Sequence, residues 1–89
     1  MAHRLIISDW ALREMGEAYE WYEEQVAGLG NEFLEALDAQ FEVIAQSPQI
    51  YAETQRGVRR ALLSRFPYGV FYASRGDIVS ILAQLPRFP

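Results

Sequence analysis

Hydrophobic and polar positions follow two different periods along the chain, which divide it into a helical N-terminal half and a C-terminal half made of strands. Residues 3–7 (HRLII) are mainly aliphatic and β-branched and predict an opening strand. From about Trp10 to Val26 apolar residues recur every three or four positions, which indicates an amphipathic helix. Either Ser8 or Asp9 supplies the side-chain oxygen that caps the start of this helix.

A second helical pattern follows a short connection. Residues 27–33 (AGLGNEF) contain two glycines, and Asn31 is expected to cap the helix that follows. Apolar residues from Phe33 to Ile44 share one helical face, and Pro48 ends the helix because the residue before a proline avoids the α conformation. Two amphipathic helices joined by so few residues predict an antiparallel helical hairpin.

Strand patterns occupy the rest of the chain. Residues 48–57 show no hydrophobic period and are expected to form a loop, whereas residues 58–63, 68–73 and 77–85 have the pattern of strands. Because short connections join these strands, they should pair antiparallel as a meander. Residues 77–85 are apolar at nearly every position, which is typical of a central strand covered on both faces or nearly so.

The predicted element order is therefore β-α-α-β-β-β, an α+β fold in which an N-terminal strand and an antiparallel helical hairpin pack on a C-terminal antiparallel β-meander. At 89 residues the chain has room for one core, so residues 1–89 are expected to form a single domain. Its 51% hydrophobic content argues against intrinsic disorder. No apolar run is long enough for a membrane span and no basic segment opens a signal peptide, so we expect a cytoplasmic protein without a membrane partner.

Charge is distributed unevenly between the two halves. The chain has a net charge of −4 and contains arginine but no lysine. Residues 1–53 contain two arginines and eleven acidic residues, a balance of −9, whereas residues 54–89 contain six arginines and one acidic residue, a balance of +5. This asymmetry indicates two surfaces that suit different partners.

The residue types exclude several kinds of active site. The chain has no cysteine and a single histidine, His3, so a His/Cys metal centre is excluded, and no cofactor or metal is expected. His3 lies inside the expected first strand, which argues against a Ser-His-Asp triad. Residues 28–33 (GLGNEF) lack the third glycine of a dinucleotide loop, and residues 75–77 (RGD) are best explained as a hairpin turn.

Residues 59–72 (RRALLSRFPYGVFY) concentrate arginine and aromatic side chains. Adjacent side chains on a strand point to opposite faces, so Arg59 and Arg60 cannot serve one site. Each arginine could pair with a carboxylate of the helices. Alternatively, because guanidinium groups bind carboxylates and phosphates and stack on aromatic rings, an open sheet face rich in both residue types could bind a protein or a nucleic acid.

Five features of the chain occur together in one known protein family. They are the tyrosine-rich first helix ending at Tyr22, the GLGNEF turn, the Ser-Pro after Ile44, the arginine pair 59–60, and RFPY at 65–68. In this combination, over nearly its whole length, the chain resembles the RelE/ParE superfamily of toxins from bacterial type II toxin–antitoxin pairs. The fold of that superfamily, a helical hairpin on an antiparallel sheet, agrees with the fold that the periodicity predicts.

The resemblance implies one of two activities. RelE-like members cut messenger RNA in the ribosomal A site, whereas ParE-like members poison DNA gyrase. This chain has no lysine, has Gly69 where ribonuclease members carry an essential arginine, and has no tyrosine after the last strand. Its acidic pI near 4.8 also opposes attraction to phosphate. The ParE-like function, a non-enzymatic gyrase inhibitor, is therefore favoured.

Two alternatives remain open. One is a ribosome-dependent mRNA endoribonuclease that uses Arg59, Arg60, Arg65 and Tyr72. The other is a non-toxic antitoxin-binding module of the same fold. The chain ends in LPRFP, which keeps an arginine and a proline of the family's ending but lacks its histidine, so the toxicity of the chain needs its own test.

The resemblance also implies partners. A cognate antitoxin, ParD-like or similar, would fold as it wraps the toxin in a hetero-oligomer, with an amphipathic helix along the helical hairpin and a further stretch near the sheet. DNA would be contacted only through this antitoxin. No residue is assigned a catalytic role. The residues expected to bind the antitoxin or the target are Trp10, Trp21, Tyr22, Arg59, Arg60, Arg65, Phe66, Tyr68, Tyr72, Arg75 and Arg87.

Overall fold

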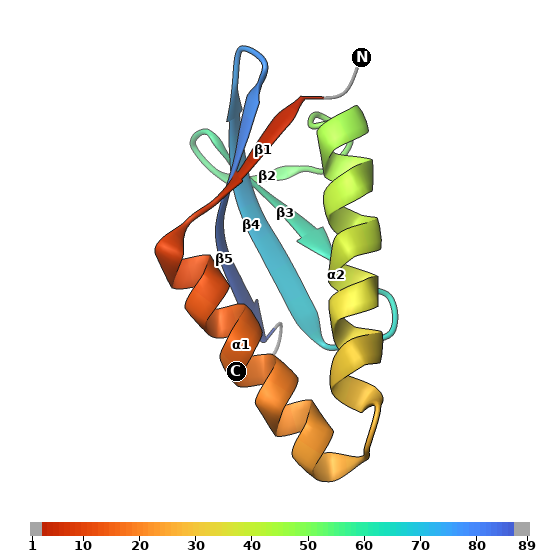
Figure 1. Ribbon diagram of the computed structural model, residues 1–89. Coiled ribbons are helices and arrows are strands. Elements are labelled where there is room, and N and C mark those ends of the chain that lie inside the picture. Colours follow the sequence, from red (N-terminus) through yellow and green to blue (C-terminus); the bar gives the residue numbers. More distant parts are fainter. Residues whose placement is uncertain (1–2, 87–89) are drawn as a thin grey trace.

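The described part of the chain folds as one five-stranded sheet with two helices against one of its faces (Figure 1). This computed structural model describes residues 3–86. The elements in chain order are β1 (Arg4–Ile7), α1 (Asp9–Gln25), α2 (Leu29–Gln46), β2 (Glu53–Gln55), β3 (Val58–Leu62), β4 (Tyr68–Arg75) and β5 (Ile78–Pro86).

The strand order in the sheet is β1-β5-β4-β3-β2. Strands β2 to β5 pair antiparallel, and β1 pairs parallel with β5. The predicted α+β class, opening strand, helical hairpin and meander are confirmed. One detail of the prediction is wrong, because residues 48–57 are not all loop but contain β2. The parallel pairing of β1 with β5, which the prediction left unspecified, makes the sheet mixed.

The start of α1 is fixed by Ser8. Its hydroxyl oxygen accepts a hydrogen bond from the backbone amide of Ala11 at 3.0 Å and donates one to the carbonyl of Leu82 at 3.0 Å. Ser8 is therefore the N-cap, and Asp9 occupies the first turn, where a negative charge is favourable beside the exposed amides. One side chain thus both starts the helix and ties it to β5.

The connection between the helices is shorter than predicted. Helix α2 begins at Leu29, so the expectation that Asn31 caps it is wrong, because Asn31 lies inside the first turn. The residue at the N-cap is Gly28, whose φ of 90° lies in the left-handed region that favours glycine. A side chain of α1, Glu23, takes the role of the cap by accepting hydrogen bonds from the amides of Gly28 and Gly30.

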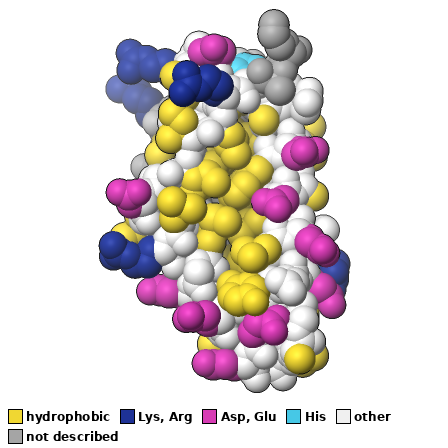
Figure 2. Space-filling view, in the orientation of Figure 1, with side chains coloured by type: hydrophobic (Ala, Val, Ile, Leu, Met, Phe, Trp, Pro, Cys, Tyr) yellow, Lys and Arg dark blue, Asp and Glu magenta, His cyan; other side chains and the backbone are white. Residues whose placement is uncertain are grey.

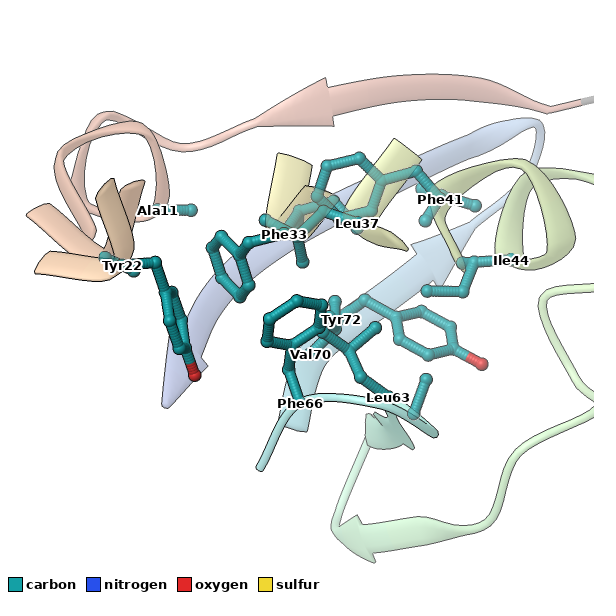
Figure 3. Close-up of a cluster of buried hydrophobic side chains, with 14 residues drawn as sticks. Ala11, Tyr22, Phe33, Leu37, Phe41, Ile44, Leu63, Phe66, Val70 and Tyr72 are labelled. Atoms are coloured by element: carbon teal, nitrogen blue, oxygen red, sulfur yellow. The ribbon is translucent and has the colours of Figure 1, made fainter. Parts of the chain in front are cut away.

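The core fills the space between the helices and the sheet (Figure 3). Leu37 and Ile44 of α2 and Val79 and Ile81 of β5 are completely buried. An aromatic cluster occupies the end of this core nearest the connection between the helices. Its rings have centroids 5.0 to 6.3 Å apart and belong to Tyr22, Phe33, Phe66 and Tyr68.

Strand β5 is covered on one face only, so the expectation of cover on both faces is wrong. Both helices lie on the face to which the buried Val79 and Ile81 belong. Leu82 and Leu85 are on the uncovered face and are about two fifths exposed. Tyr72 pairs with Ile81 whereas Phe71 pairs with Ala83, so Leu82 is the extra residue of a β-bulge. The bulge changes which positions of β5 face the core, and an unbroken apolar run in the sequence does not reveal it.

Candidate protein-binding surfaces

Arg59 and Arg60 lie on opposite faces of the sheet, as the strand pattern predicts. Arg59 pairs across the sheet with the buried Tyr72, whereas Arg60 pairs with Phe71 on the other face. On its side of the sheet, the Arg59 guanidinium donates to the carbonyl of Tyr51 at 2.6 Å and lies 3.8 Å from a carboxylate oxygen of Glu53. Arg59 therefore fixes the segment before β3, and its side chain is only 25% exposed.

Arg65 follows β3 and forms a surface ion pair. Its Nη2 lies 2.6 Å from Oε1 of Glu32 on α2, and its guanidinium carbon lies 5.3 Å from the ring centre of Phe66. Both partners of the ion pair are about half exposed or more, so the pair stabilises the fold by no more than about 1 kcal/mol. Arg65 is thus held close to α2 and away from the exposed face of the sheet.

The face of the sheet without helices forms the first candidate binding surface, which we call the open face. Cross-strand pairing places Arg60 beside Phe71, and Leu62 and Leu85 on either side of Gly69. The apolar side chains of the open face that are 38% to 44% exposed are Ile6, Leu62, Leu82 and Leu85. Four large apolar side chains exposed on one face of a sheet make that face a candidate interaction site.

Arginines border the open face. Arg4 of β1 and Arg75 of β4 both pair with Ile78 of β5, so their side chains lie on the same side at one end of the sheet. Within residues 3–86, neither these two arginines nor Arg60 has a carboxylate within ion-pair distance. The open face therefore combines an apolar centre with arginines whose charge is not neutralised by the chain itself.

The second candidate surface is an apolar strip on the helix side, which we call the helical groove (Figure 2). At one end it is lined by Leu12, Met15, Tyr19 and Leu34 of the two helices. At the other end it is lined by Leu5 and Ile7 of β1 and by Phe41 and Ala45 of α2. Acidic side chains border the strip in Figure 2. Asp38 and Glu42 line its second end.

The predicted aromatic residues divide into exposed and buried groups. Trp10 and Trp21 on α1 are 57% and 56% exposed and are available to a partner. Tyr22, Phe66 and Tyr72 are buried in the core. Among the other predicted residues, Tyr68 is half-buried, Arg75 is exposed at a strand end, and Arg87 lies outside the described residues.

Tyr72 is fully buried, and its environment is that of a structural residue. Its hydroxyl donates a 2.7 Å hydrogen bond to the carbonyl of Pro48. Burial raises the pKa of Tyr72, and the nearby Arg59 guanidinium lowers it in part. Of the four residues considered for RNA cleavage, only Arg59 and Tyr72 lie together, whereas Arg60 is on the open face and Arg65 is beside α2.

Sequence reasoning did not single out a cleft between α1 and the adjoining ends of β4 and β5. Its polar lining includes Glu14 and Glu17 of α1 and Gln84 of β5, and its aromatic lining includes Trp21 and Tyr68. The one signal in the sequence is a glutamine inside the mainly apolar run of the last strand. In residues 3–86 no cluster of acidic and histidine side chains could hold a metal ion, and neither helix is long and apolar enough to cross a membrane.

The fold is similar to that of chains in solved structures of a ParDE system and of a RelE-RelB complex. A chain from the chromosomal ParDE TA system of P. aeruginosa superimposes with a TM-score of 0.82 at 18% identity, covering 93% of this chain and 94% of that chain. A chain from the archaeal RelE-RelB complex of Pyrococcus horikoshii OT3 gives a TM-score of 0.51 at 19% identity, covering 98% and 97%. No family model matches the sequence, and no curated protein matches it. The chain therefore has the RelE/ParE fold, in a form closer to the ParDE chain than to the RelE-RelB chain.

Proposed function

We propose that this protein is the toxin of a type II toxin–antitoxin pair and that a cognate antitoxin neutralises it by direct binding. The observation that carries the proposal is the similarity to the ParDE chain, which extends over nine tenths of both chains at a TM-score of 0.82. Structural similarity at 18% identity establishes the fold and not the function. The function therefore also has to follow from the surfaces of this chain.

The helical groove and the open face support a partner that wraps the protein. Helix α1 contains six acidic residues and α2 contains four, against the single arginine Arg13, so the border of the helical groove is strongly negative. The open face instead has Arg4, Arg60 and Arg75 around an apolar centre. A segment with apolar and basic residues over the helices, followed by acidic residues over the sheet, would complement both surfaces.

Such a segment would be disordered before binding and would fold on the toxin. A wrap that covers both faces can bury more than about 1,000 Å², which supports roughly nanomolar affinity even after the cost of ordering the segment. DNA would then be contacted by the antitoxin, because the negative helices of this chain repel phosphate. The resulting assembly is a hetero-oligomer of toxin and antitoxin.

DNA gyrase in the cytoplasm is the proposed target. The hydroxyl of Tyr72 is buried on Pro48, and Arg59 is held by Tyr51 and Glu53, so neither is placed to act on a phosphate group. A side chain added at Gly69 would meet the aliphatic part of Arg60 at 3.3 Å, so Arg60 partly covers the position where ribonucleases of the superfamily carry an arginine. These contacts disfavour a messenger RNA endoribonuclease.

Controlled expression tests the proposal. The chain is induced in bacteria alone and together with the open reading frame adjacent to its own gene, and growth, cell shape and translation are followed. Growth arrest with filamentous cells and an induced DNA-damage response is expected, with relief by the adjacent product. The matching test in vitro is loss of supercoiling by purified gyrase.

Other outcomes would identify a different function. Rapid arrest of translation with cleaved messages, abolished by Arg65→Ala, would identify a ribonuclease and overturn the gyrase assignment. Normal growth together with tight binding of the adjacent product would identify a non-toxic antitoxin-binding module. Normal growth with no binding would overturn the toxin–antitoxin proposal as a whole.

A further inference from the structure

The cleft between α1 and the ends of β4 and β5 has the size and the chemistry of a binding pocket. Its volume is about 410 Å³, within the range of roughly 300–1,000 Å³ found for ligand sites. Trp21 is more than half exposed at its edge, so the cleft can be entered from solvent. Its lining residues that matter for the argument are Glu14, Glu17, Trp21, Tyr22, Tyr68 and Gln84.

Gln84 is the central residue of this cleft. It is only 2% exposed, yet neither its side-chain nitrogen nor its side-chain oxygen has a hydrogen-bonding partner among the described residues. Its backbone amide, in contrast, donates to Oε1 of Glu14 at 2.9 Å, which holds this part of β5 against α1. A buried polar group without a partner destabilises the folded protein. The two side-chain atoms have almost no accessible surface, so Gln84 would turn towards the cleft to meet a ligand, and one that offers both a donor and an acceptor would then satisfy it.

The charge of the cleft selects a cation. Glu14 and Glu17 are the only charged residues that line it within residues 3–86. One oxygen of Glu14 is used by Gln84, which leaves the other oxygen and the carboxylate of Glu17 free to accept hydrogen bonds. The rings of Trp21 and Tyr68 in the same lining favour a cation as well, because the face of an aromatic ring attracts positive charge.

We propose that this cleft binds an arginine side chain of a partner protein. A planar guanidinium group can stack on an aromatic ring while it donates to the Gln84 oxygen and to the two carboxylates, which a lysine ammonium does less well. The Gln84 nitrogen can then donate to a backbone carbonyl of the same partner. That the partner is the antitoxin rests on the proposed function, whereas the preference for arginine rests on the cleft alone.

A titration with a small probe tests the preference without any antitoxin. The full chain, labelled with ¹⁵N, is titrated with Nα-acetyl-arginine-N-methylamide and separately with the corresponding citrulline compound, which has nearly the same shape but no charge. We expect the arginine probe to shift the Trp21 indole and Gln84 side-chain signals, with an affinity about tenfold higher than that of citrulline, as for other charge-assisted hydrogen bonds. The lysine compound should bind with intermediate affinity.

Matched variants assign the binding to the cleft. Glu17→Gln should lower the affinity for the arginine probe about three- to tenfold. Glu20→Gln is the same change on α1 outside the cleft and should leave this affinity unchanged. Trp21→Ala, at an exposed position where folding is not at risk, should weaken it as well. Equal affinity for arginine and citrulline, or equal effects of Glu17→Gln and Glu20→Gln, would overturn the proposal.

The titration and the growth experiment fail independently. A chain that does not arrest growth but binds arginine in this cleft would disprove the toxin function and keep the site. A chain that arrests growth but shows no preference for arginine over citrulline would keep the toxin function and disprove the site.

Discussion

Oε1 of Glu23, in the last turns of α1, lies 2.8 Å from the backbone nitrogen of Gly30 in the first turn of α2, and it accepts a hydrogen bond there. The second carboxylate oxygen accepts one from Gly28 at 3.1 Å. One side chain therefore satisfies two of the four amides that a helix leaves unpaired at its start. This contact stabilises the tight turn between the helices.

Replacing Glu23 with alanine should destabilise the protein by about 1–2 kcal/mol, because the start of α2 loses its cap. The free energy of unfolding is measured by urea denaturation, with circular dichroism as the signal. Glu24→Ala, at an exposed neighbouring position that makes no such contact, is the matched control and should change the free energy of unfolding by less than about 0.5 kcal/mol. Similar losses in both variants would contradict the role of the carboxylate.

Gly30 and Gly16 should respond in opposite directions to the same substitution. A Cβ at Gly30 would lie 2.7 Å from both the ring and the carbonyl oxygen of Tyr19, so Gly30→Ala must push the helices apart and cost about 1–3 kcal/mol. A Cβ at Gly16, inside α1, meets nothing within 4 Å, so Gly16→Ala should stabilise by about 0.5–1 kcal/mol. Thermal unfolding of the two variants measures the difference, and a stabilised Gly30→Ala would contradict the close packing of the helices.

Tyr72→Phe tests whether the Tyr72 hydroxyl serves the stability of the fold or takes part in a reaction. The variant leaves the Pro48 carbonyl without its buried donor and should lose about 1–2 kcal/mol of stability. We expect growth arrest to persist under conditions where the variant is folded, because the hydroxyl faces the core. A folded, stable Tyr72→Phe protein that no longer arrests growth would instead indicate that the hydroxyl takes part in the activity.

The stability of the protein should fall at alkaline pH. Burial raises the pKa of Tyr22, Tyr68 and Tyr72 above the ordinary value of 10.0, so the folded chain holds these protons more tightly than the unfolded chain. Their contribution is complete below about pH 10 and is lost as the pH rises through that value towards the higher pKa values of the folded state. Urea denaturation between pH 8 and 11 should show this decline, with a shallower slope in Tyr72→Phe. A free energy of unfolding that rises above pH 10 would contradict it.

The two adjacent arginines should differ in their effect on the antitoxin. Arg60→Glu reverses a charge on the open face that has no described ion pair, so the variant should fold and should release the antitoxin faster. Arg59→Glu places a carboxylate near the Tyr51 carbonyl and Glu53 and should mainly destabilise the toxin. Calorimetry measures the affinity of the folded Arg60→Glu protein for the antitoxin. An unchanged affinity would show that the antitoxin does not use the open face.

Local periodicity was sufficient to predict most of the elements. Both helices and the three long antiparallel strands have patterns that depend only on neighbouring residues, and the cap at Ser8 is a local signal too. Strand β2 was not predicted because its three residues, Glu53–Gln55, are polar and exposed and have no apolar pattern. Its strand conformation depends on pairing with β3, and the pattern of these three residues does not reveal that pairing.

The binding surfaces could be predicted only in part. Strand alternation correctly placed Arg59 and Arg60 on different faces. The sequence pattern did not show that Tyr22 and Tyr72 are buried whereas Tyr68 is only half-buried, because the degree of burial depends on how the helices pack on the sheet. The position of Gln84 in a cleft depends on the bulge at Leu82, which shifts the inward positions of β5. The site therefore depends on a backbone irregularity that the apolar pattern does not encode.

The parallel pairing of the first strand with the last also determines when the protein can complete its fold during synthesis. Ser8 and Leu82, which bond to each other beside this pair, are 74 positions apart in the chain. The ribosome has to release nearly the whole polypeptide before β1 finds its neighbour, and such distant contacts slow folding. A nascent chain therefore exposes the inner sides of both helices for most of its translation. The proposed antitoxin, made at the same time, would meet this unfinished surface first and bind the chain before its fold is complete.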